Sequence, residues 1–254
     1  MILHLGDCLE IMRAMDADSI DAIVTSPPYD DLRDYGNTWD FEASATEMAR
    51  VLRNGGVIVW IVADQTIEGS ESGSSFKQAL FFKSIGLKLH DTMIWLKGPG
   101  PFQHKNRYIS AFEYMFVFSK GKPKSAQLIR DRKNKHYGVR VHGTERQRNG
   151  ATKPLSTIQK SKLIKEFGSR TNVWEITPDK SNKTGHPAVF PLSLIEDHLR
   201  SWCSQGDTIL DPFMGSGTTG IAAKNLGFNF TGIELNPEYF EIARARIGGP
   251  LGES

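Results

Sequence analysis

Apolar and polar residues alternate along most of the chain with the periods of strands and helices. Residues 57–63 are apolar at every position, which is typical of a strand buried on both faces of a parallel sheet. Other short apolar runs bounded by turn residues predict further strands. The predicted strands are residues 2–5, 22–25, 57–63, 87–96, 112–118, 208–210 and 230–233.

Between these runs, apolar residues recur at the spacing of one helix face. A helix with Leu9, Met12 and Met15 on one face is predicted after the first strand. Residues 40–53 are predicted to form a second helix, which Gly55-Gly56 would end. Further helices are predicted at residues 76–85, at Leu192, Ile195, Leu199 and Trp202, at residues 218–225, and after Asn236-Pro237-Glu238. Strands that alternate with helices predict a three-layer α/β sandwich with a mainly parallel sheet.

The composition is that of a folded globular protein. The 254 residues are 39% apolar and 24% charged, which excludes a disordered, collagen-like or fibrous chain. The longest apolar run is far shorter than the roughly 20 residues that span a bilayer, so no membrane partner is expected. The amino terminus carries no export signal and two cysteines form at most one disulfide, so we expect a cytoplasmic protein.

Positive charge is concentrated in one part of the chain. Residues 120–186 hold 17 Lys and Arg against 5 Asp and Glu, although the whole chain has a net charge of +2. Such a stretch is either a solvated surface or a site for a polyanion, and this imbalance favours nucleic acid because each neutralised phosphate releases counterions. We interpret the segment as an irregular insertion with one helix near residues 155–167. The candidate phosphate-binding residues are Arg132, Lys133, Lys135, Arg140, Arg146 and Arg148.

A glycine-rich loop, Asp211-Pro212-Phe213-Met214-Gly215-Ser216-Gly217-Thr218, joins a predicted strand to a predicted helix. Glycines let a backbone approach a ligand closely, and the amide groups at a helix start suit the anionic tail of an adenosine cofactor. Glu234 is the last residue of the next strand. A carboxylate at this position either accepts hydrogen bonds from ribose hydroxyl groups or is merely exposed at the strand end. A carboxylate at Asp211 disfavours a pyrophosphate but tolerates an ammonium group. S-adenosylmethionine, which has an ammonium and no phosphate, is therefore favoured over NAD.

A second loop, Ser26-Pro27-Pro28-Tyr29, follows the strand at residues 22–25. Two prolines stiffen a turn, which is one sufficient explanation of this loop. They also leave carbonyl groups without competing amide donors, so that the loop presents acceptors, including Ser26 Oγ, beside an aromatic ring. Such a surface can orient the amino group of a flat heterocycle while Tyr29 stacks on its face.

Together the two loops resemble those of the DNA methyltransferases that modify adenine N6 or cytosine N4. In that family the proline-tyrosine loop is catalytic and the loop that begins with Asp211-Pro212-Phe213 binds S-adenosylmethionine. The order here, with the catalytic loop first, resembles the permuted β class, whose target-recognition region lies between the loops. The resemblance implies a Rossmann-like, seven-stranded sheet. It also implies a catalytic half at residues 1–119, a target-recognition region at 120–185 and a cofactor half at 186–254.

Further positions can be matched to the family. Gly6-Asp7-Cys8 resembles the motif whose acid contacts the cofactor adenine, although Asp7 is equally suited to cap a helix. His186 begins a segment that resembles the motif bordering the methionine end of the cofactor, or it belongs to a structural turn. The family needs no metal, and His136, His142, His198 and Cys203 lack the spacing of a metal site.

Serine at the first catalytic position favours cytosine N4 by analogy, because adenine enzymes of this class more often have aspartate there. The target base lies inside stacked double-stranded DNA and has to be flipped out, with Tyr29 as its stacking partner. Related enzymes are often dimers and can work beside a restriction endonuclease, so a homodimer and a cognate nuclease are candidate partners. The recognised DNA sequence cannot be read from the chain.

Two alternatives belong to other classes. A non-catalytic DNA-binding module explains the basic segment but neither loop. A methyltransferase for RNA or for a protein amide can share the proline-proline-tyrosine loop, but it usually places its cofactor loop before the catalytic one.

Overall fold

The structure is a computed structural model that describes residues 1–28, 39–99, 105–178 and 190–249. The chain divides into two compact units. The first unit combines Met1–Gln127 with Asn172–Ser254, and the second is Leu128–Thr171. Each unit is described by itself.

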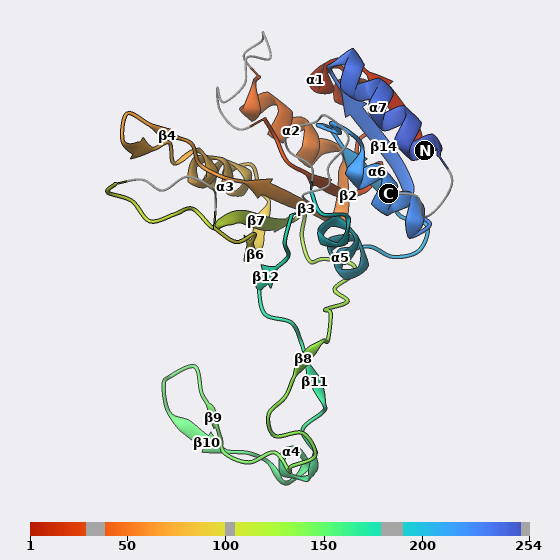
Figure 1. Cartoon of the computed structure of the whole chain (residues 1–254). Helices are drawn as coiled ribbons and strands as arrows, with labels where there is room; N and C mark the ends of the chain where they lie inside the picture. The colour runs from red at the N-terminus through yellow and green to blue at the C-terminus, as the bar shows by residue number, and fades with distance from the viewer. Residues whose placement is uncertain (29–38, 100–104, 179–189, 250–254) are drawn as a thin grey trace. The chain divides into compact units, whose positions relative to one another are not determined.

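The first unit is built on a central sheet that, among the described residues, has eight strands (Figure 1). In spatial order they are β1 (Ile2–Leu5), β14 (Asn229–Glu234), β13 (Thr208–Asp211), β2 (Ile20–Thr25), β3 (Leu52–Val62), β7 (Phe112–Ser119), β6 (Lys88–Leu96) and β12 (Val173–Glu175). The first five are parallel to one another, and β7 runs antiparallel to both of its neighbours. The mainly parallel sheet is confirmed. The strand beyond the expected seven is β12, which pairs in parallel with β6.

Helices cover both faces of this sheet. The helices are α1 (Cys8–Ala14), α2 (Phe41–Val51), α3 (Ser74–Ser84), α5 (Leu192–Trp202), α6 (Thr218–Asn225) and α7 (Pro237–Gly248). Residues Ile58, Trp60 and Val62 of β3 share one apolar core with residues of α1, α2 and α3. The alternate residues Val57, Val59 and Ile61 are also buried and point to the opposite face, where α5, α6 and α7 pack against one another. The three-layer sandwich predicted from the alternation is therefore present.

One predicted boundary is wrong. Helix α2 ends at Val51, and β3 begins at Leu52, so Gly55-Gly56 lies inside a strand instead of ending a helix. Leu52 pairs with Ile20, and the register then shifts before Val57 pairs with Ala22. A Cβ on Gly56 would lie 2.8 Å from the carbonyl oxygen of Asp21, so only glycine permits this close approach of β2 and β3.

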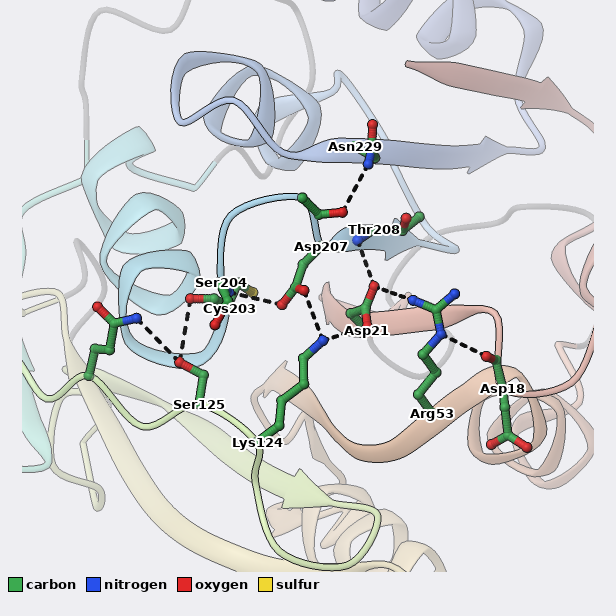
Figure 2. A network of polar contacts seen from close by, with 12 residues as sticks. Asp18, Asp21, Arg53, Lys124, Ser125, Cys203, Ser204, Asp207, Thr208 and Asn229 are labelled. Atoms are coloured by element: carbon green, nitrogen blue, oxygen red, sulfur yellow. Dashed lines mark hydrogen bonds and ion pairs between the residues drawn. The ribbon is translucent and has the colours of Figure 1, made fainter.

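The amino-terminal ends of β2 and β13 are joined by a network of ion pairs (Figure 2). Lys124 donates to Asp21 Oδ1 at 2.6 Å and to Asp207 Oδ1 at 2.8 Å, while Arg53 donates to Asp21 Oδ2 at 2.6 Å. Burial opposes ionisation of Asp21, but its hydrogen bonds outweigh burial and lower the pKa of its carboxyl group. The network therefore holds the segment that follows β7 at one edge of the sheet. This edge is opposite the one from which the loops after β2 and β13 emerge.

The second unit contains only short elements (Figure 1). Two antiparallel pairs form, β8 (Arg132–Lys133) with β11 (Phe167–Gly168) and β9 (Thr144–Arg146) with β10 (Thr152–Pro154). The helix expected at residues 155–167 is reduced to α4 (Thr157–Ser161), with Ser156 as its cap. None of residues 128–171 is buried, so a longer helix has no core against which to pack.

A small hairpin, β4 (Thr66–Ile67) with β5 (Ser70–Glu71), lies between β3 and α3 in the sequence. Asp64 follows β3 and accepts hydrogen bonds from the backbone and hydroxyl of Ser75, which fixes the start of α3. Among the described residues, no helix combines the length and the apolar character needed to cross a bilayer.

Candidate functional site

The two loops singled out in the sequence leave the same edge of the sheet. Ser26 follows β2 and Pro212 follows β13, and these strands are parallel neighbours with Ile23 opposite Leu210. The carboxyl ends of parallel strands meet at one edge, which is where open α/β sheets bind ligands. Segments that are nearly 200 residues apart in the sequence are thereby brought side by side.

A buried hydrogen bond connects the roots of the loops. Thr25 Oγ1, at the end of β2, donates to Asp211 Oδ1, at the end of β13, over 2.6 Å. Both residues are buried, Thr25 completely. The next residue of the proline loop, Ser26, is half-buried, and Pro27 is buried. Tyr29 lies outside the described residues.

Asp211 binds groups of the protein itself. Its Oδ1 also accepts the backbone N–H of Phe213 at 3.1 Å, and Thr219 hydrogen-bonds the same side chain. Burial, with a smaller contribution from the negative charge of Glu234, raises the pKa of Asp211 to about 6, although the three donors lower it. Near neutral pH the site therefore contains buried negative charge, which favours a cationic ligand and disfavours a phosphate.

Glu234 holds the glycine-rich loop in place. Its Oε2 accepts the backbone N–H of Gly215 at 2.7 Å, and its Oε1 accepts that of Asn236 at 2.8 Å. Burial raises the pKa of this carboxyl group as well. Glu234 is thus not a bare exposed strand end. Each carboxylate oxygen has a second lone pair, so Glu234 can still accept hydrogen bonds from ribose hydroxyl groups.

The loop glycines are required by backbone shape and by helix packing. Gly215 and Gly217 have φ of 53° and 86°, the left-handed region that favours glycine. A Cβ on Gly220 would lie 2.4 Å from Ile247 Cδ1 of α7. The start of α6 therefore approaches α7 closely, which is a structural reason for glycine at position 220.

Arg246 of α7 is a residue that the sequence analysis missed. Its guanidinium donates to the carbonyl oxygen of Ser216 at 2.5 Å and to Ser216 Oγ at 2.9 Å. It fastens the loop between the two glycines. An arginine near the end of an amphipathic helix gives no sequence signal of such a contact, because the partner is 30 residues away.

Phe213 points into the aromatic part of the core. Its ring lies edge to face with Trp39 at 5.1 Å and near Trp60 at 6.4 Å between centroids. Trp39 in turn donates to Ser44 Oγ on α2. The aromatic side chain anchors the loop to the layer of α1, α2 and α3.

The first predicted cofactor motif lies at the neighbouring strand end. Asp7 caps α1 by accepting the N–H groups of Leu9 and Glu10, and Gly6 N donates to the carbonyl oxygen of Glu234 at 2.9 Å. Cys8 is buried, and burial raises the pKa of its thiol to about 11, so it is a neutral core residue. His186 lies outside the described residues.

The six basic residues predicted to contact phosphates all belong to the second unit and are exposed. They are Arg132, Lys133, Lys135, Arg140, Arg146 and Arg148. Residues 128–171 contain 12 Lys and Arg against 3 Asp and Glu. The unit therefore has a strong positive potential without a buried core.

Comparison with known proteins gives consistent results. A family model described as DNA methylase matches residues 20–245. The orphan methyltransferase M.BamHII of Bacillus amyloliquefaciens is 47% identical over 253 residues, covering 96% of this chain and 91% of that protein. The type II methyltransferase M.Cfr9I of Citrobacter freundii is 28% identical over 291 residues, with coverage of 97% and 87%. The crystal structure of the M1.HpyAVI–SAM complex superposes with a TM-score of 0.64 at 25% identity, covering 98% of this chain and 99% of that one.

Proposed function

The chain belongs to the family of DNA methylases that modify adenine N6 or cytosine N4, and we propose that its own target is cytosine N4. Methylation of an exocyclic amino group in DNA, with S-adenosylmethionine as the methyl donor, is the activity of this family. The residue that favours cytosine is Ser26, because adenine enzymes of the resembled class more often have aspartate at that position.

The observation that carries the proposal is the parallel pairing of β2 with β13. It supports one site in which the proline loop faces the target base and the glycine-rich loop holds the methyl donor. S-adenosylmethionine supplies an electrophilic methyl group on a positively charged sulfur. The residues that fit it are the buried acids Asp211 and Glu234 and the loop from Gly215 to Gly217, because they offer negative charge and a close backbone approach without a phosphate cradle.

The residues of the proline loop orient the nucleophile. Conjugation with the ring deactivates an exocyclic amine. Hydrogen bonds from this amine to Ser26 Oγ and to the carbonyl oxygen of Pro27 draw the nitrogen toward tetrahedral geometry and align its lone pair. A strong base is not needed before attack, because the nitrogen becomes acidic only as the new N–C bond forms and the methyl–sulfur bond breaks. The proton would then pass to solvent water, and S-adenosylhomocysteine would be the leaving group.

The second unit is proposed to bind the DNA. Its exposed Lys and Arg side chains supply sequence-independent affinity for phosphates, and the base is flipped out of the duplex toward Ser26. The names of the relatives do not favour a cognate restriction endonuclease as partner, because M.BamHII, at 47% identity, is named an orphan methyltransferase, whereas M.Cfr9I, at 28%, is named a type II methyltransferase.

The experiment that tests this function is the identification of the methylated nucleoside. Unmethylated plasmid DNA is incubated with the protein and with S-adenosylmethionine that carries a deuterated methyl group, then digested to nucleosides and analysed by mass spectrometry. Labelled N4-methyldeoxycytidine is expected. Labelled N6-methyldeoxyadenosine would overturn the choice of base. Transfer to RNA or to a protein amide with unlabelled DNA would overturn the choice of substrate.

A further inference from the structure

We propose that Thr25 is a positioning residue for methyl transfer, because its hydrogen bond to Asp211 fixes the proline loop against the glycine-rich loop. This inference rests on the function proposed above. It assigns a role to a completely buried residue that stands next to the serine singled out in the sequence.

The bond lies at the point where the two segments separate. The pairing of β2 with β13 includes Ala22 with Ile209 and Ile23 with Leu210. The proline loop starts at Ser26, three residues beyond Ile23, and the glycine-rich loop starts at Pro212, two residues beyond Leu210. Beyond the last backbone pair, the two strands are joined by side chains. Thr25 Oγ1 donates a buried hydrogen bond of 2.6 Å to Asp211 Oδ1.

Asp211 connects Thr25 to the glycine-rich loop. The oxygen that accepts from Thr25 also accepts the N–H of Phe213, two residues into the loop. Thr219, in the first turn of α6, hydrogen-bonds Asp211 and lies with its Oγ1 3.5 Å from the carbonyl oxygen of Val24. The ends of β2 and β13, the loop and the start of α6 are thus held by one carboxylate.

Joining two strands through a buried carboxylate costs free energy, since an ionised group loses its hydration on burial. A valine at position 25 would have nearly the shape of threonine and would pack equally well, but it could not donate to Asp211. The hydroxyl therefore contributes orientation more than packing. Orientation matters here because a displacement of about 1 Å between reacting groups can reduce a rate about 100-fold.

The test separates the rate of the chemical step from cofactor binding. Single-turnover methylation of DNA at saturating S-adenosylmethionine and the dissociation constant of S-adenosylmethionine are measured at pH 8 for the wild type, Thr25→Val and Thr25→Ser. Thr231→Val is the matched control, because Thr231 is also buried but lies in the middle of β14.

Thr25→Val should reduce the single-turnover rate about 10- to 100-fold, with cofactor affinity within about threefold of the wild type. Thr25→Ser should restore the rate to within about threefold, and Thr231→Val should leave it unchanged. An undiminished rate in Thr25→Val, or a loss that Thr25→Ser does not rescue, would overturn the proposal. If Thr25→Val does not fold, Thr25→Ala, whose side chain also lacks a donor, replaces it under the same criteria. Failure of the proposed function is recognised separately, because the wild type would then not methylate DNA.

Discussion

At the scale of single residues, the site depends on side chains that hold the backbone of its loops in place. Asp211 and Glu234 each accept backbone N–H groups of the glycine-rich loop, and Thr25 ties this arrangement to the proline loop. Ser26 differs from them, because it is the residue assigned to the reacting amine. These two kinds of residue should respond differently to substitution.

Ser26→Ala should lower the turnover number by at least about 100-fold while the affinity for S-adenosylmethionine changes little, since an acceptor for the amine is lost and the cofactor loop is untouched. Turnover and cofactor binding are measured by methyl transfer to DNA and by calorimetry. Ser19→Ala, at the opposite end of β2, is the control. An equal loss of turnover and affinity would contradict the role of Ser26.

The raised pKa of Asp211 predicts a pH-dependent contribution to stability. Because burial raises this pKa from 3.8 to about 6, the folded state binds the proton more tightly than the unfolded state does. The group therefore favours the folded state most below about pH 4, and that contribution is lost as pH rises to about 6, at roughly 1.4 kcal/mol per pH unit. The free energy of unfolding of Asp211→Asn, relative to the wild type, should increase by about 2.4 kcal/mol from pH 4 to pH 7. Urea unfolding at both pH values checks this, and a difference that does not vary with pH would refute it.

At the scale of elements, the close packing of α6 on α7 fixes the position of the glycine-rich loop. Gly217 and Gly220 leave room for Ala243 and Ile247, and Arg246 reaches back to Ser216. The loop is thus held from α7 as well as from β14. A contact outside the motif should therefore affect cofactor binding.

Arg246→Gln should weaken binding of S-adenosylmethionine about 10-fold, because hydrogen bonds from a charged donor contribute roughly 1.5–3 kcal/mol. Arg244→Gln is a matched control on the same helix. Arg244 pairs with Glu241 at the surface, where an ion pair contributes little. Calorimetric titration with the cofactor compares the two variants, and equal affinities would show that Arg246 does not support the loop.

Periodicity predicted the elements well where they are buried. Strands such as β3 and the amphipathic helix α5 carry their pattern in consecutive residues, and the two loops could be placed at strand ends on that basis. The prediction was wrong at Gly55-Gly56, which lies inside β3 because β2 approaches it closely, and it overestimated the length of the helix near residues 155–167, where only α4 forms because no core supports a longer helix. The contacts of Thr25 and Arg246 join distant residues, so no local pattern could reveal them.

At the scale of the whole molecule, charge and burial are divided between the two units. Among the residues that the structure describes, all buried ones belong to the first unit, whereas residues 128–171 contain none and carry a large excess of Lys and Arg. Short antiparallel pairs without a core are marginally stable by themselves. The second unit is therefore suited to gain order when phosphates neutralise its charge.

A triple variant, Arg140→Ala, Arg146→Ala and Arg148→Ala, should weaken DNA binding and reduce the slope of log Kd against log salt concentration by about 2 to 3, since each lost phosphate contact releases fewer counterions. The affinity for S-adenosylmethionine should stay the same. The control removes equal charge from the exposed Lys83, Lys88 and Lys122, which lie near the amino-terminal edge of the sheet. Unchanged slopes in the first variant, measured by fluorescence anisotropy, would exclude these arginines from the DNA interface.

The central claim is that the proline loop and the glycine-rich loop form one methyl-transfer site. A crystal structure of the protein with sinefungin, in which an amine-bearing carbon replaces the methylated sulfur of S-adenosylmethionine, tests it most directly. The account predicts the adenosine part near Asp7 and Glu234, the amino-acid tail against Gly215–Gly217, and the amine that replaces the methyl group directed at Ser26 and Pro27. Sinefungin bound away from the ends of β2 and β13, or with its amine turned away from Ser26, would contradict the account.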